Sequence, residues 1–274
     1  MPELPEVETM VRDLRPELVG RSIRRASLSH DDVLRGVSRR TLVSRLAGAT
    51  VHAVERRAKH AVLHVGERRL VVQPGMTGSL TVQRPPLPEE ERRYAVLQAE
   101  LDDGRVLVYH DVRRLGTLLL LDEKGWQRYD QALGPEPLDS ALSDAEFARR
   151  LRGSRQAVKK LIMDQRVIVG VGNIYANEAL FASGIDPSRA GNRVTPAEAA
   201  LLLREIRRIL SAAITSRGST IRDYRTGTGE AGGFQGSHLV YGRGGKPCVQ
   251  CGTRLTETHL IDARTTVFCH RCQS

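Results

Sequence analysis

The first residues of the chain, M1-P-E-L-P-E6, place a proline behind the initiator methionine and two glutamates beside it. A proline in second position favours removal of the methionine, which would leave Pro2 with a free secondary amine. An α-amino group titrates near pH ~8, so an appreciable fraction is an unprotonated nucleophile at neutral pH. Its attack on C1′ of a deoxyribose would displace the base as an iminium ion forms, with Glu3 and Glu6 moving the protons. The alternative is a helix start whose acids favour the helix dipole.

All four cysteines lie near the end of the printed chain, as C248-V-Q-C251 and C269-H-R-C272. Each pair supplies two thiolates from one tight turn, and two pairs complete a tetrahedral zinc site. Because the protein fills all four positions, we expect one structural zinc ion. Disulfides are the alternative, which the absence of an export signal disfavours. Arg264 is expected near the tip of the hairpin that this zinc holds, a shape that fits a DNA groove, although it could equally be an ordinary surface arginine.

A third polar group precedes a predicted helix. The segment V169-G-V-G-N173 ends in an asparagine where the helix begins, and R155-Q-A-V-K159-K160 brings cations to the same neighbourhood. Free N–H groups at a helix N-terminus bind phosphate, and an asparagine there adds a side-chain donor. The alternative is an N-cap without a ligand.

The apolar pattern of the first half indicates one helix followed by strands. One stripe predicts a helix over residues 6–15, ended by Pro16 and Gly20. From about residue 22 to 121, β-branched and leucine-rich runs broken by turns are typical of an antiparallel sandwich or barrel. The clearest predicted strands cover residues 61–65, 70–73, 94–98 and 105–109.

Helical spacing returns after residue 138. It predicts helices over residues 144–151, 156–165, 174–183 and 196–216. The glycine-rich residues 226–236 are either a flexible linker or a loop that orders on a ligand. Residues 254–260 and 265–268 are predicted to form the strands of the zinc hairpin.

The composition indicates a polyanionic partner. A formal charge of +10 and a pI of about 9.9 favour nucleic acid, although an acidic membrane surface responds to the same field. No apolar run approaches the ~20 residues that cross a bilayer, and no signal peptide is recognisable. We therefore expect a soluble, cytosolic protein.

Taken in order, the motifs resemble one enzyme family over nearly the whole chain. They are M1-P-E-L-P-E-V-E-T9, R57-A-K59, G75-M-T-G-S-L80, D111-V-R-R-L-G116, L133-G-P-E-P-L138, V169-G-V-G-N-I-Y-A176, Y241-G-R243 and the four cysteines. This set closely resembles bacterial formamidopyrimidine-DNA glycosylase. The PELPE start, as against PEGPE, resembles this family rather than the related endonuclease VIII.

The resemblance implies an α+β multidomain fold. An N-terminal catalytic domain over residues 1–132 would be an antiparallel β-sandwich with a leading helix. A helix-two-turn-helix DNA-binding domain with the lesion-recognition loop would cover 133–237, and a four-cysteine zinc finger β-hairpin 238–274. The implied enzyme is monomeric, works on duplex DNA in the bacterial cytoplasm, and associates with the nucleoid through DNA. It would excise 8-oxoguanine and formamidopyrimidines and nick the abasic site by β,δ-elimination.

The resemblance also implies roles for single residues. Pro2 matches the Schiff-base nucleophile, Glu3 the acid that assists sugar opening, Lys59 the proton-transfer lysine of β-elimination, and Arg264 the finger arginine of phosphate binding and δ-elimination. The residues matched to DNA contacts or to filling the space of the flipped base are Met76, Tyr94, Arg113, Leu115, Lys159 and Asn173. Those matched to lesion recognition are Glu6, Ser219, Ile221, Arg222, Asp223 and Tyr224.

Two residues depart from the family pattern. Leu115 stands where phenylalanine is usual, which keeps an apolar wedge but removes an aromatic face for stacking. Tyr94 stands where a DNA-contacting histidine is common, and a phenol donates to phosphate without carrying charge. Two alternative functions remain at this point: an endonuclease VIII-like preference for oxidised pyrimidines, and a non-catalytic protein that binds damaged DNA.

Overall fold

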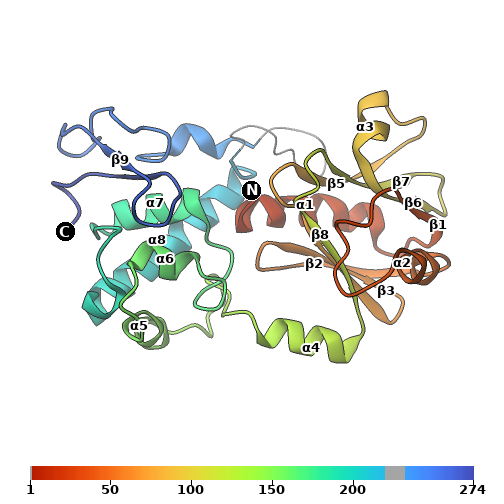
Figure 1. Ribbon diagram of the computed structural model, residues 1–274, viewed down its shortest axis with the longest axis horizontal. Helices are drawn as coiled ribbons and strands as arrows, with labels where there is room; N and C mark the ends of the chain where they lie inside the picture. Colours follow the sequence, from red (N-terminus) through yellow and green to blue (C-terminus); the bar gives the residue numbers. More distant parts are fainter. Residues whose placement is uncertain (1, 220–231) are drawn as a thin grey trace. The chain divides into compact units, whose positions relative to one another are not determined.

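The computed structural model describes residues 2–219 and 232–274. Its chain forms two compact units, Met1–Gln131 with Ser216–Gly233, and Ala132–Thr215 with Phe234–Ser274 (Figure 1). The helical segment and the cysteine segment therefore belong to one unit. The three-domain division stays a prediction.

The first unit contains two four-stranded antiparallel sheets among its described residues. One has the order β1-β6-β7-β5 and the other β2-β3-β4-β8. The strands are β1 (Ile23–Leu28), β2 (Val51–Arg57), β3 (His60–Val65), β4 (Arg68–Gln73), β5 (Gly78–Gln83), β6 (Ala95–Leu101), β7 (Val106–Asp111) and β8 (Thr117–Leu121). Leucine and valine side chains from both sheets meet in one buried cluster. This confirms the predicted antiparallel architecture.

The leading helix α1 (Leu4–Leu18) contributes its apolar stripe to the same core. Val7, Met10, Leu14 and Leu18 are all buried. The predicted end at Pro16 was wrong, because the helix continues through this proline for another two residues. Burial of Leu18 on the stripe outweighs the backbone hydrogen bond that a proline cannot donate.

Three short helices of the first unit were not predicted. They are α2 (Arg39–Leu46), α3 (Glu89–Tyr94) and α4 (Glu123–Gln131). Ser38 caps α2 by accepting a hydrogen bond from the backbone N–H of Thr41, whereas α3 has no buried residue at all. Tyr94 therefore ends a helix instead of starting a strand. Its ring lies edge-on to that of His110, with the centroids 5.6 Å apart.

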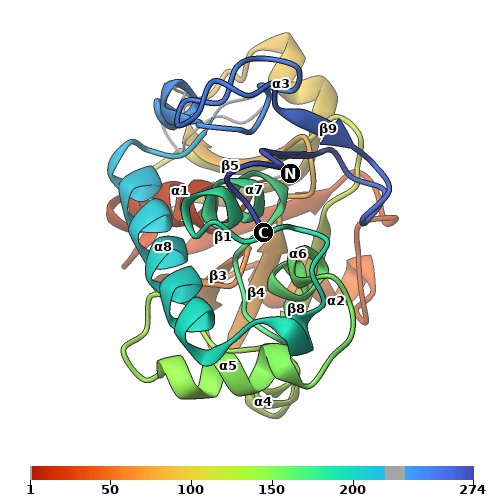
Figure 2. The ribbon, with the colours of Figure 1, turned by 90° about the vertical axis from the view of Figure 1, so that its left-hand side faces the viewer.

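The second unit is built on four α-helices, which confirms its predicted helical character. They are α5 (Asp144–Arg152), α6 (Val158–Met163), α7 (Asn173–Ala182) and α8 (Pro196–Thr215). The long helix α8 packs against both α5 and α7 through its apolar face (Figure 2). Two single 3-10 turns, η1 (Gly191–Arg193) and η2 (Phe234–Ser237), complete the described helical elements.

A small hairpin, β9 (Thr256–Thr258) and β10 (Thr266–Phe268), packs on α7 of the same unit. Its strands pair antiparallel with Thr266 opposite Thr258, which leaves residues 259–265 as the connecting turn. Phe181 of α7 joins Val240, Leu255 and Val267 in a separate core, in which two of the cysteines are buried and against which the other two pack. This confirms the predicted hairpin. Within the described residues, no helix is long and apolar enough to cross a bilayer.

His60 at the start of β3 is buried beside α4, and this has a consequence for stability. Its ring nitrogens lie 3.3 Å from the hydroxyl of Tyr129. Burial, reinforced by the charges of Lys59 and Arg57, lowers the pKa of His60 from 6.5 to about 4. The folded protein therefore holds this imidazole neutral at neutral pH.

We predict that acid destabilises the first unit through His60. Its pKa is lower in the folded than in the unfolded state, so its contribution is complete above pH ~6.5 and is lost as the pH falls toward 4. The full loss amounts to about 3 kcal/mol. Urea unfolding between pH 6.5 and 4.5, followed by fluorescence of the single tryptophan, Trp126 on α4, measures it.

The variant His60→Gln should flatten the dependence of the unfolding free energy on pH across this window. The control His52→Gln removes an exposed histidine from β2 and should keep the wild-type slope. A His60→Gln protein with the wild-type slope would contradict the assignment.

Candidate functional site

The N-terminal residues are built into the start of α1. Pro2 is buried, and Glu3 is the extended residue before the first helical turn. The backbone N–H of Glu3 donates to Oε2 of Glu6 at 2.8 Å, and the Glu3 side chain accepts from the N–H of Glu6 in return. This reciprocal capping box fixes the backbone directly behind Pro2. Met1 lies outside the described residues.

The buried carboxylate of Glu6 also binds a distant segment of the same unit. Its Oε1 accepts the backbone N–H of Ser219 at 2.7 Å. Gly218 has φ +81°, and a Cβ there would lie 2.9 Å from this oxygen, so the close approach requires glycine. Arg217 adds an ion pair with Asp13 of α1 at 2.9 Å.

Glu6 thus links Glu3, the residue that follows Pro2, to the segment that leads into the predicted lesion-recognition loop. Ser219 is itself buried. The other residues predicted for lesion recognition, Ile221, Arg222, Asp223 and Tyr224, lie outside the described residues.

Lys59 lies in the turn between β2 and β3 and is almost fully buried. Ala58 before it adopts the left-handed conformation, with φ 55°. The turn is tied to α1, because Arg56 donates both to the carboxylate of Glu8 and to the carbonyl of Ala58, at 3.0 Å each. Burial raises the pKa of Glu8, but hydrogen bonds from Arg12 and Arg56 outweigh it and lower the pKa overall.

Helix α4 holds the same turn from its other side. Arg57 forms an ion pair with Asp130, and His60 contacts Tyr129. Burial raises the pKa of Tyr129 to about 12, so its hydroxyl stays protonated. The turn that carries Lys59 is thereby fixed by contacts with two helices.

Met76, Arg113 and Leu115 lie in two adjoining loops, β4–β5 and β7–β8. Met76 and Leu115 are 46% and 51% exposed, which is unusual for side chains of this size. A guanidinium nitrogen of Arg113 lies 3.7 Å from the sulfur of Met76. The structure therefore brings these predicted wedge residues together on an exposed rim.

The buried carboxylate of Asp111 organises both loops. Its Oδ1 accepts from the hydroxyl of Thr77, and its Oδ2 accepts from the N–H of Gly116 at 2.9 Å and the hydroxyl of Tyr109 at 3.0 Å. Burial, with the charge of Asp111, raises the pKa of Tyr109. Asp111 belongs to the motif D111-V-R-R-L-G116, but this role was not predicted from the sequence.

In the second unit, Asn173 and Lys159 both bind the β9–β10 hairpin. The side-chain amide of Asn173, the first residue of α7, donates to the carbonyl of Thr265 at 3.0 Å. The ammonium of Lys159 on α6 is completely buried and donates to the hydroxyl of Thr266 at 2.7 Å. Arg264, in the turn between the strands, is exposed. The three residues are thus grouped around one hairpin.

Two further polar residues of α7 hold neighbouring segments, and neither was predicted from the sequence. Asn177 accepts the backbone N–H of Val267 at 2.7 Å. The buried carboxylate of Glu178 accepts three successive N–H groups, those of Leu239, Val240 and Tyr241, at 2.8 to 3.0 Å. The four-residue spacing of Asn173 and Asn177 on a largely apolar helix was the available signal.

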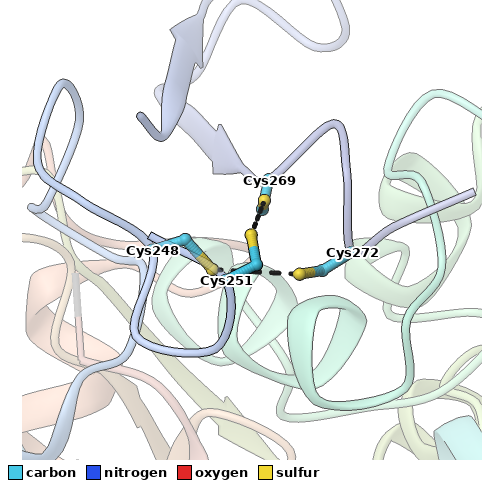
Figure 3. A group of neighbouring side chains, drawn as sticks. All are labelled: Cys248, Cys251, Cys269 and Cys272. Atoms are coloured by element: carbon cyan, nitrogen blue, oxygen red, sulfur yellow. Dashed lines mark hydrogen bonds between the residues drawn. The ribbon is translucent and has the colours of Figure 1, made fainter. Parts of the chain in front are cut away.

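The four cysteine sulfurs form one cluster, all within 4.8 Å of each other (Figure 3). Sγ of Cys251 lies 3.6 Å from that of Cys269, and Sγ of Cys248 lies 4.0 Å from that of Cys272. All four cysteines are free, and these separations far exceed the S–S bond length of about 2 Å. A tetrahedral site with metal–sulfur bonds of about 2.3 Å has edges of about 3.8 Å. The cluster therefore fits a metal ion.

Family models match most of the chain. The model described as the formamidopyrimidine-DNA glycosylase N-terminal domain matches residues 1–118, and that described as the H2TH domain of the same glycosylase matches residues 133–225. A curated formamidopyrimidine-DNA glycosylase from Stutzerimonas stutzeri is 44% identical over 273 residues, with 100% of both chains covered.

Solved structures of the Lactococcus lactis enzyme have the same fold. A variant in complex with DNA containing Fapy-dG aligns with a TM-score of 0.92 and 30% identity, over 100% of each chain. The wild-type enzyme in complex with DNA containing an oxidised pyrimidine aligns with a TM-score of 0.90 at the same identity and coverage. The chain belongs to the formamidopyrimidine-DNA glycosylase family, whose members are glycosylases and abasic-site lyases.

Proposed function

We propose that the chain is a bifunctional DNA repair enzyme that excises oxidised purines from duplex DNA and then cleaves the strand at the abasic site. The observation that carries this proposal is the fixed conformation of the N-terminal residues. Pro2 precedes a helix whose first turn is fixed by the buried pair Glu3 and Glu6. A protein that only binds DNA has no need of a proline held in this way, which becomes a terminal amine once Met1 is removed.

In the proposed reaction the amine of Pro2 attacks C1′ of the damaged nucleotide. The C1′–N bond breaks as the base departs with a proton, and the sugar opens to leave an iminium ion on Pro2. Glu3 supplies a proton for ring opening. Loss of a C2′ proton then expels the 3′ phosphate, and Lys59 is assigned this transfer because its turn is fixed within the unit that carries Pro2. Loss of a C4′ proton then drives a second elimination, which breaks the C5′–O bond and expels the 5′ phosphate.

DNA binding is assigned to residues of both units. Met76, Arg113 and Leu115 present an exposed apolar and cationic edge, suited to fill the space left by an extruded base. Arg264 and Asn173 are assigned to phosphates. Lys159 was predicted to contact phosphate as well, but its ammonium is buried against the hairpin, which supports a role in holding that hairpin. Tyr94 is assigned a hydrogen bond from its uncharged hydroxyl to a DNA phosphate.

We further propose that the cysteine cluster holds one zinc ion, because four thiolates suit zinc and leave no position for a substrate. When bound, the metal would supply no catalytic chemistry and would crosslink the segments on either side of the β9–β10 hairpin.

A second candidate within the family is a preference for oxidised pyrimidines. The observation in favour of this second candidate is that the Lactococcus lactis relative was solved in complex with DNA containing an oxidised pyrimidine. Rates of base release from 8-oxoguanine and thymine glycol duplexes, measured side by side, decide between the two. Faster release of 8-oxoguanine supports the leading proposal.

We predict that borohydride traps the protein covalently on DNA containing 8-oxoguanine, and that Pro2→Gly lowers the rate of trapping by roughly a hundredfold or more. Glycine offers a primary amine, whose imine must first be protonated to react as an iminium ion, and it sits on a freer backbone. Both the reactivity and the positioning of the nucleophile are therefore reduced. Pro5→Ala changes the neighbouring proline of the same turn and should trap normally. Intact mass confirms beforehand that Met1 is absent. Undiminished trapping by Pro2→Gly would refute the Pro2 mechanism.

We also predict that removal of the metal, or Cys251→Ser, weakens binding to duplex DNA by roughly tenfold to a hundredfold, because the hairpin that presents Arg264 unfolds. The first unit should remain folded, as reported by an unchanged urea transition of Trp126 fluorescence. Adding zinc back should restore affinity in the wild type only. Unchanged affinity after chelation would show that Arg264 does not depend on the metal.

A further inference from the structure

The strongest unexplained feature is the completely buried ammonium of Lys159. Besides Thr266, it donates to Oδ1 of Asp262 at 3.2 Å and to the carbonyl of Thr265 at 3.4 Å. The side chain of Asp262 is itself only 8% exposed. An ammonium removed from water requires an opposing charge nearby. Asp262 supplies that charge from the turn of the hairpin.

Asp262 also holds the backbone of Arg264. Its Oδ1, the same oxygen that meets Lys159, accepts the N–H of Arg264 at 3.2 Å. On the other side of the arginine, the hydroxyl of Thr266 donates to the carbonyl of Arg264 at 3.3 Å. Ala263, which lies between Asp262 and Arg264 in the sequence, has φ 58°, a left-handed conformation that needs support from its surroundings. The backbone of Arg264 is therefore held by hydrogen bonds to the side chains of Asp262 and Thr266, both of which also contact Lys159.

We propose that Asp262 is a positioning residue for Arg264. Its carboxylate joins the buried ammonium on α6 to the hairpin turn and so sets the direction in which the exposed guanidinium leaves the surface. This inference rests on the proposed function, in which Arg264 binds a DNA phosphate for the second elimination. The roles implied by the family resemblance do not include Asp262.

The test uses the zinc-loaded full chain and a duplex with a preformed abasic site. Asp262→Asn keeps the shape of the side chain but removes its charge, and Asp262→Ala also removes the acceptor. Both should slow the second elimination roughly tenfold or more, while the first elimination, driven by Pro2, changes less than about twofold. Gel separation of the two 3′ ends gives both rates. Glu257→Gln removes a charge from an exposed position on β9 and should behave as wild type.

A double variant distinguishes positioning from a general loss of stability. If Asp262 acts through Arg264, adding Asp262→Asn to Arg264→Ala should slow the second elimination no further. Wild-type rates for Asp262→Asn and Asp262→Ala, or equal slowing of both eliminations, would overturn the proposal.

A second measurement does not depend on activity. Amide hydrogen exchange at Arg264, without DNA, should be at least about tenfold faster in Asp262→Ala than in wild type or Glu257→Gln, because its acceptor is gone. Unchanged exchange would overturn the inference about Asp262. A wild-type protein that releases no base and leaves no nick would instead refute the proposed function, and exchange would still decide the role of Asp262.

Discussion

The first unit depends on one buried carboxylate, that of Glu6, because both of its oxygens accept hydrogen bonds from the backbone. Glu6 accepts the N–H of Glu3 on one oxygen and the N–H of Ser219 on the other. The first bond fixes the backbone that carries Pro2, and the second fixes the segment before the predicted lesion loop. A charged group removed from water is stable only if its hydrogen bonds are made, so each bond supports the other. The same contact that caps the helix therefore aligns the proposed nucleophile.

The same physical principle recurs wherever an exposed residue is presented. Asp111 holds the loops that carry Met76 and Leu115. Lys159 holds the hairpin that carries Arg264 by hydrogen bonds. In each case a buried polar group satisfies several backbone or hydroxyl donors or acceptors at once. The exposed groups that we propose to contact DNA are thereby given a fixed direction at low conformational cost.

The sequence allowed prediction of features that depend on local spacing. The stripe of α1, the β-branched and leucine-rich runs of the strands, the later helices and the paired cysteines are each visible within a short stretch of sequence. The end of α1 did not follow, because burial of Leu18 overrides Pro16. The helix α3 was also missed, since it buries no residue and so leaves no periodic signal.

Positioning residues were the least predictable part of the site. The family resemblance predicts a phosphate contact for Lys159, but its partners Asp262 and Thr266 in the structure lie about a hundred residues away in sequence. The pairing of Glu6 with Ser219 spans 213 positions. No local pattern encodes such contacts, which exist only once the tertiary fold has formed.

The most direct test of the account is the rate at which Glu6→Gln forms the borohydride-trapped adduct on a preformed abasic site under single-turnover conditions. A glutamine can accept only one of the two N–H groups, since its second terminal atom is itself a donor. The account predicts a rate roughly tenfold to a hundredfold below wild type, with affinity for an uncleavable abasic duplex within about threefold. Adduct formation at the wild-type rate would contradict the claim that Glu6 aligns the nucleophile.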